Sequence, residues 1–228
     1  MSGAPHISHD DHHRALVNRL SSEVTAKRPL WPVGTRLGLW AALEMGVLVW
    51  TTSHTTNSFV AKLSHPVYII EIALFATAAI IAAALALKSA VPGRRLSASE
   101  AMMAAALVLA GTIIVATARP IDTSNPLSDF MRIGLRCARE TTILGALPWI
   151  ALWWLVRRGA SVNGWLSGLL VGSGSLFFSF ALMRLVCPID EPLHLLTWHL
   201  LPALILVALS AVAGSIWLRF RPNTTGGA

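Results

Sequence analysis

The 228-residue sequence has few charged residues: only 13% are Asp, Glu, Lys or Arg, whereas 54% are hydrophobic. A soluble domain typically carries about 25% charged residues. The shortfall lies in long apolar runs, each ending close to an arginine or lysine. A helix needs roughly 20 apolar residues to cross a bilayer. The sequence therefore excludes a soluble enzyme and predicts one integral membrane domain.

Three further absences restrict the function. Although the net charge is +7, no basic patch is interleaved with aromatic residues. Bases stack on such aromatics, so we expect no direct nucleic-acid binding. The N-terminal region lacks the charged, apolar and small-residue parts of a cleavable signal peptide. No pair of inverted halves with broken helices is visible, which disfavours a secondary transporter.

The apolar runs are separated by proline, glycine and arginine, and they predict an all-α bundle of six transmembrane helices. We place these helices at 36–53, 66–90, 98–118, 132–157, 162–186 and 196–219, within a membrane domain at 35–220. Small residues such as Gly168 and Gly172 allow helix backbones to approach closely in lipid. The prediction is a compact bundle, and the sequence leaves open whether it forms a homodimer.

The distribution of basic residues predicts the orientation of this bundle. If the N-terminus is inside the cell, 12 of the 18 Lys and Arg residues lie in cytoplasmic segments or at the inner ends of helices. Cytoplasmic segments of membrane proteins carry such an excess. We therefore predict that both termini are cytoplasmic, as an N-terminal segment at 1–34 and a tail at 221–228.

A short amphipathic helix is predicted within the N-terminal segment, at residues 12–27. Its apolar residues recur at the spacing of one helical face: Leu16, Val17, Leu20 and Val24. So short a helix cannot bury its apolar face without another surface to pack against. The helix either lies on the membrane surface, docks in the groove of a partner, or folds only when it binds one.

The sequence has two cysteines, Cys137 and Cys187. Counting 1.5 Å per residue from the short turn between the fourth and fifth helices puts both near the outer end of the bundle. A disulfide can persist in that compartment, and thiolates also bind soft ions such as copper(I), zinc or cadmium. The third alternative is that both are small buried hydrophobic residues. Further ligands for a metal ion are available nearby: Asp190, Glu191, His194 and His199.

Several charged residues fall within or close to the predicted spans. A charge at the centre of the bilayer costs at least about 2.5–3.5 kcal/mol, so such residues normally pair or line a cavity. We expect pairing, or a polar cavity at the outer side that contains the cysteines. The residues are Glu44, Glu71, Arg136, Arg139, Glu140 and Arg184.

A series of short motifs in the second half of the chain resembles a known family. The series is GLRC at 134–137, LP at 147–148, RRGA at 157–160, the glycine-rich fifth span and CPID at 187–190, followed by Trp198. With six spans and a short N-terminal helix, it resembles the NrsF-type anti-sigma factors of proteobacteria. The resemblance covers nearly the whole chain and is most specific between Gly134 and Trp198.

The resemblance implies a multi-pass protein of the bacterial inner membrane that is not an enzyme. Its cytoplasmic segment would sequester an extracytoplasmic-function (ECF) sigma factor. Cys137 and Cys187 match the two outer-facing cysteines that this family uses to sense heavy-metal or oxidative stress. The only bound ion expected is the signal itself.

Two other classes of function are weighed against this one. A small transporter or metal exporter would use the intramembrane charges. A membrane thiol oxidoreductase would usually show a Cys-x-x-Cys motif, which the sequence lacks. An intramembrane serine protease is disfavoured because Ser173 and Ser175 lie near mid-bilayer, whereas His199 lies near the outer surface. A nucleophile and its base must be within about 3.2 Å of each other.

Overall fold

The computed structural model describes residues 14–15, 17–18, 30–54, 62–94, 96–121 and 126–218. These ranges contain helices and connecting turns but no strand, in agreement with the predicted all-α class. The elements are α2 (Val33–Ser53), α4 (Pro66–Ser89), α5 (Ala98–Thr117), α6 (Leu127–Arg157), α7 (Gly164–Val186), α8 (Pro192–Leu195), the π-helix η1 (Leu196–Leu200) and α9 (Leu201–Trp217). Each predicted span overlaps one long helix.

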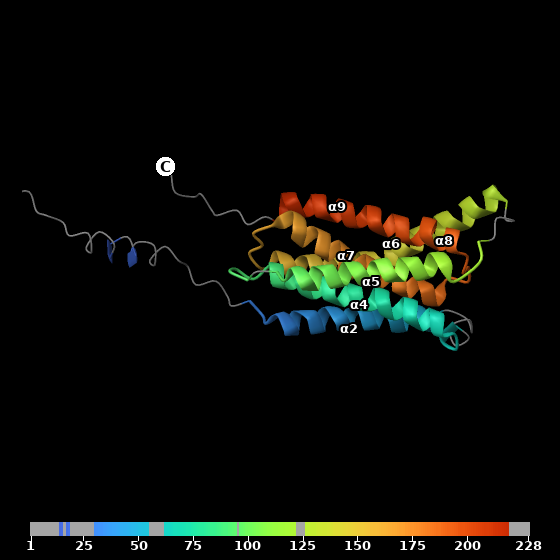
Figure 1. Cartoon of the computed structure of the whole chain (residues 1–228). Helices are drawn as coiled ribbons and strands as arrows, with labels where there is room; N and C mark the ends of the chain where they lie inside the picture. Colours follow the sequence, from blue (N-terminus) through green and yellow to red (C-terminus); the bar gives the residue numbers. More distant parts are fainter. Residues whose placement is uncertain are drawn as a thin grey trace, which may run out of the picture. The chain divides into compact units, whose positions relative to one another are not determined.

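The long helices lie side by side in one bundle (Figure 1). α7 packs against α4, α6 and α9 and is the most buried of the long apolar helices. Successive long helices run in opposite directions, so α2 begins and α9 ends at the same end of the bundle. The opposite end holds the segment that joins α7 to α8, and we call it the Cys187 end.

Five helices in the described ranges are long and apolar enough to cross a membrane. They are α2, α4, α5, α7 and the continuous helix Pro192–Trp217, which comprises α8, η1 and α9. α6 is not among them although it has 31 residues. The reason is a charged first half, with Asp129, Arg132, Arg136, Arg139 and Glu140. The structure thus supports a membrane-embedded bundle, while a sixth span at α6 stays a prediction.

Local sequence explains where several helices begin. Pro66 and Pro192 occupy the first turns of α4 and α8, where proline's fixed φ suits a helix and its missing N–H removes no bond. Ser97 caps α5, because its hydroxyl accepts a hydrogen bond from the Glu100 N–H. Such caps satisfy N–H groups that have no partner within the helix.

Two buried side chains attach α2 to the rest of the bundle. The Arg36 guanidinium donates to the carbonyl oxygens of Leu155 at 3.3 Å and Leu87 at 3.4 Å. The Trp40 indole N–H donates to the Pro148 carbonyl oxygen at 3.3 Å. Pro148 lies inside α6. α2 is therefore linked to α6 at two levels, about 10 Å apart along α6.

Glycines allow the backbones of α7 and α9 to touch. A Cβ on Gly168 would overlap the Ser210 carbonyl oxygen and would lie 2.8 Å from the Cα of Gly214. These neighbours are backbone atoms, which cannot move aside as a flexible side chain would. The close approach predicted from the small residues of the fifth span is thus confirmed at Gly168.

We expect Gly168→Val to destabilise the protein by about 1–3 kcal/mol or more, the usual effect of overpacking a dense core. The measurement is the thermal unfolding midpoint of the purified protein in detergent. Gly46→Val is the matched control, since a Cβ at Gly46 would meet nothing within 4 Å. Equal midpoints for the two variants would contradict the packing described for α7 and α9.

The chain divides into two units, Met1–Leu30 and Trp31–Ala228. In the first unit Arg14, Ala15, Val17 and Asn18 are helical, and the Val17 side chain is exposed. The other members of the predicted partner-binding face, Leu16, Leu20 and Val24, lie outside the described residues, as does the predicted tail at 221–228.

Candidate functional site

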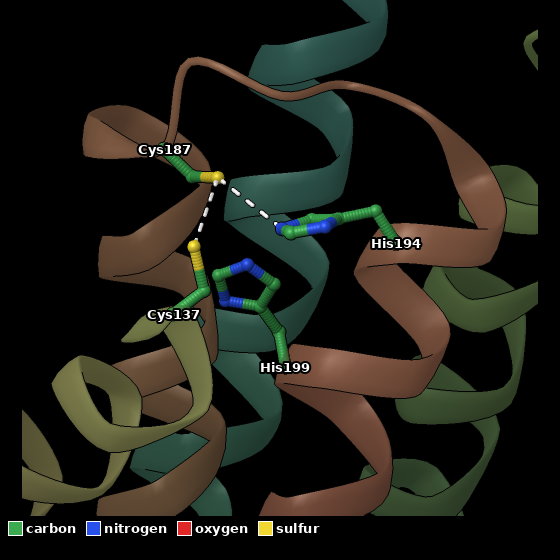
Figure 2. Close-up of side chains that lie close together, drawn as sticks. All are labelled: Cys137, Cys187, His194 and His199. Carbon is green, nitrogen blue, oxygen red and sulfur yellow. Dashed lines mark hydrogen bonds between the residues drawn. The ribbon is translucent and has the colours of Figure 1, made fainter. Parts of the chain in front are cut away.

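Two cysteines and two histidines converge at the Cys187 end of the bundle (Figure 2). Cys137 is on α6, Cys187 directly follows α7, His194 is on α8 and His199 is on η1. The two Sγ atoms are 4.0 Å apart, and Cys187 Sγ is 3.8 Å from His194 Nε2. One ligand atom from each residue lies within 4.8 Å of the other three. We call these residues the Cys–His cluster; the predicted proximity of its two cysteines is confirmed.

A π-helical turn brings the two histidines together. They are five residues apart, so in a regular α-helix of 3.6 residues per turn they would point about 140° away from each other. η1 contains His199 and is wound more widely, with hydrogen bonds between residues five apart, which reduces the angle between the two side chains. The ring centroids are 5.3 Å apart. Pro202 favours this winding, because it has no N–H to donate to the Trp198 carbonyl.

Thr141 on α6 fixes the His199 ring. Its hydroxyl donates to the Cys137 carbonyl oxygen at 2.9 Å and lies 3.1 Å from His199 Nδ1. A hydroxyl has only one proton, so Nδ1–H is the donor in the second contact. Nε2 then carries the lone pair, and it is buried without a hydrogen-bond partner in the described part of the chain. A neutral imidazole with a free nitrogen is the form that binds metal ions.

The Cys–His cluster is nearly closed to water. Cys187, His194 and His199 are each at most 2% exposed. The Phe130 ring packs on His194 at 6.4 Å between centroids, and the Phe180 ring lies at the same distance from His199. An apolar shell of this kind restricts solvent access and strengthens the bonds between a metal ion and its ligands.

The electrostatics of the site favour a thiolate at Cys187. The hydrogen bond from the Cys137 thiol lowers the pKa of Cys187, and its contact with His194 acts in the same direction, although burial opposes them. Thiolates, not thiols, are the forms that bind metal ions and react with oxidants. The cluster therefore has the chemistry of a soft-metal or redox site.

A comparison with protein families gives the identity of the chain. The family model described as NrsF, negative regulator of sigma F, matches residues 20–220. The chain belongs to the NrsF family. No curated protein and no solved structure matches it. Family membership, together with the long apolar helices, indicates a membrane-embedded negative regulator of a sigma factor rather than an enzyme.

The two acidic residues predicted as further ligands of this NrsF-family protein lie apart from the Cys–His cluster. Asp190 pairs with Arg184 at 3.1 Å and with Lys62 at 3.4 Å. Glu191 is the N-cap of α8, where its carboxylate accepts a hydrogen bond from the His194 N–H at 3.2 Å. Both carboxylates therefore position the segment around the cluster instead of joining it.

Among the charged residues predicted to form ion pairs within the spans, Glu71 is the clearest case. Its buried carboxylate accepts hydrogen bonds from Arg119 Nη1 and Arg184 Nε, each at 2.8 Å. Glu44 behaves differently, because its buried carboxylate has no hydrogen-bond partner among the described residues. Pairing of intramembrane charge is thus concentrated at the Cys187 end.

Sequence reasoning missed three residues that hold the site of the NrsF-family protein in place. Thr141 orients His199, and Ser179 donates to the Thr141 carbonyl oxygen at 2.5 Å. Lys62 donates to the carbonyl oxygens of Arg184 and Cys187. The spacing of Cys137 and Thr141, one helical turn apart, was the only local signal for any of them.

Proposed function

We propose that this NrsF-family protein is an anti-sigma factor of the bacterial inner membrane. Its N-terminal helix at 12–27 holds an ECF sigma factor in the cytoplasm. The Cys–His cluster, on the outer side, senses heavy-metal or oxidative stress. Binding of a metal ion to the cluster, or oxidation of its cysteines, changes the arrangement of the bundle, and the sigma factor is released.

The observation that carries this proposal is the spacing within the Cys–His cluster. Bond lengths of about 2.3 Å for Zn–S and about 2.0–2.1 Å for Zn–N separate tetrahedral ligands by about 3.3–3.8 Å. The separations of 4.0 Å between the sulfurs and 3.8 Å from Cys187 Sγ to His194 Nε2 are close to these values. Two thiolates and two imidazoles favour zinc, copper(I) or cadmium over hard cations.

Hydrogen bonds between α6 and α2 connect the Cys–His cluster to the helix that follows the N-terminal segment. Cys137 is on α6, and α6 accepts hydrogen bonds from Arg36 and Trp40 of α2. α2 follows the N-terminal segment directly in the chain. A signal shifts the population only if two arrangements bind it with different affinity. We infer that ligation draws the outer ends of α6, α7 and α8 together and thereby displaces α2.

The proposed topology has six spans with both termini in the cytoplasm. The described bundle supports it, since α2 begins and α9 ends at the same end. α6 has 31 residues, about 46 Å of helix at 1.5 Å per residue, whereas the hydrocarbon core is about 30 Å thick. Its apolar second half can therefore lie in the membrane while its charged first half extends beyond it.

An oxidant is a second candidate signal at the same pair of cysteines. Their sulfurs are 4.0 Å apart, and a disulfide needs about 2.05 Å. A two-electron oxidant would convert the Cys137 thiol and the Cys187 thiolate to a disulfide with release of one proton. The bridge would pull α6 toward the end of α7, in the same direction as a shared metal ion.

The anti-sigma role is tested by co-purifying the full chain, in detergent, with the sigma factor encoded beside it. We expect the sigma factor to be retained by the full chain and lost when residues 1–30 are deleted. Leu20→Asp should also lose it, since a charge would enter the apolar face. Ser22→Asp, which lies off that face, is the matched control. Retention of the sigma factor by the deletion variant would contradict the proposed docking helix.

A further inference from the structure

A second site lies beside the Cys–His cluster, in a cavity of about 430 Å³ at the Cys187 end. The cavity is bounded by the residues that precede α4, by the start of α4 and by the residues that follow α5. Its lining includes the cations Lys62 and Arg119 and the carboxylate of Asp190. His65, Tyr68 and Ala118 also line it. None of these residues belongs to the cluster.

Among the residues that the structure describes, the charges around this cavity do not balance. Three described cations, Lys62, Arg119 and Arg184, share two described carboxylates. Arg119 Nη1 and Arg184 Nη2 bind Glu71 at 2.8 and 2.7 Å, while Arg184 Nη1 and Lys62 Nζ bind the same oxygen of Asp190 at 3.1 and 3.4 Å. One positive charge is left over. Lys62 is 7% exposed and Arg184 is fully buried, and a buried charge is costly unless it is compensated.

The protein compensates this charge only in part. The Tyr68 ring lies among all three cations, with centroid distances of 5.4 Å to Lys62, 4.6 Å to Arg119 and 4.7 Å to Arg184. A cation–π contact attracts the cation but supplies no negative charge. Arg119 Nη2 is also buried without a hydrogen-bond partner in the described ranges.

The start of α4 adds to the positive potential. His65 and Pro66 line the cavity, and α4 has no side-chain cap at this end. The first turn of a helix carries a partial positive charge and favours anions. In α4 this is an effect of the helix dipole, because Pro66 has no N–H and the Tyr68 N–H donates to the His65 carbonyl oxygen.

We propose that the cavity binds an oxyanion of the phosphate type, held by Arg119 and the start of α4. Lys62 adds to the positive potential, while its own protons are donated to Arg184, Cys187 and Asp190. The chemistry is shared by free phosphate and by the headgroup of an anionic phospholipid, which the cavity would meet at the membrane surface.

Binding is tested on the full chain in neutral maltoside detergent. The thermal unfolding midpoint is measured while sodium phosphate replaces sodium chloride at constant ionic strength. In parallel, native mass spectrometry compares retention of phosphatidylglycerol with retention of phosphatidylcholine. A midpoint that rises with phosphate identifies the free anion as a ligand. Retention of phosphatidylglycerol alone identifies the lipid headgroup.

Three variants distinguish anion binding in the cavity from non-specific binding to positive charge on the surface. Arg119→Gln should weaken phosphate or phosphatidylglycerol binding at least tenfold. Ala118→Glu should do the same without removing any ion pair, so it remains informative if Arg119→Gln does not fold. Arg132→Gln, at an exposed arginine of the same end, should bind like the wild type. No binding by the wild type, or equal loss in Arg132→Gln, would overturn the proposal. Sigma-factor binding is a separate measurement, so failure here leaves the anti-sigma role standing.

Discussion

Cys187→Ser is expected to weaken zinc or cadmium binding by more than about 100-fold. Changing a residue that only supports a metal ligand costs about 10–100-fold, and Cys187 is at the centre of the cluster, next to both Cys137 Sγ and His194 Nε2. Serine does not form the anionic ligand that a thiolate provides. The measurement is isothermal titration calorimetry of the purified full chain with each metal, in a reducing buffer that does not chelate the metal.

Glu191→Gln is the matched control for this experiment. It lies four residues from Cys187 and retains an oxygen that can cap α8 at the His194 N–H. We expect its metal affinity to stay within about threefold of the wild type, because the carboxylate is not part of the cluster. Equal losses in Cys187→Ser and Glu191→Gln would show that the metal binds elsewhere or that both changes merely disturb the segment.

Glu71→Gln is expected to lower the free energy of unfolding by about 3–5 kcal/mol, the usual consequence of removing one partner of a buried ion pair. The carboxylate is fully buried and binds both Arg119 and Arg184. In the described part of the chain, its loss leaves the two guanidinium groups with Asp190 as the nearby countercharge. The measurement is equilibrium unfolding of the detergent-solubilised protein, followed by circular dichroism.

The control for Glu71→Gln is Glu140→Gln. Glu140 pairs with Arg139 on an exposed part of α6 at 3.0 Å, and exposed ion pairs contribute about 0–1 kcal/mol. We expect a change within about 0.5 kcal/mol for this variant. A small effect at both positions would mean that the charges around Glu71 are solvated rather than buried.

Much of the fold was predictable because the signals are local. Runs of about 20 apolar residues set the helices, and prolines such as Pro66 set where some of them begin. α6 starts at Leu127, directly after Pro126, rather than at residue 132. Charged side chains hid this extension, since hydropathy alone cannot distinguish a helix that extends beyond the membrane from a loop.

The site was only partly predictable. Counting along two antiparallel helices was enough to place Cys137 near Cys187, because helix geometry is regular. The choice of histidines over Asp190 and Glu191 depended on two features that hydropathy and residue spacing do not reveal. One is the π-helical turn that aligns His194 with His199. The other is Lys62, more than 120 residues away in sequence, which engages Asp190 and the Cys187 carbonyl.

We propose that metal binding at the Cys–His cluster lowers the affinity of the protein for its sigma factor. The most direct test measures the affinity of the detergent-solubilised full chain for its sigma factor, with and without saturating zinc or cadmium. Coupling between two sites is commonly 5–150-fold, and we expect at least a tenfold loss of affinity in the wild type and none in Cys187→Ser. An unchanged affinity in the wild type, or an equal loss in Cys187→Ser, would contradict the claim.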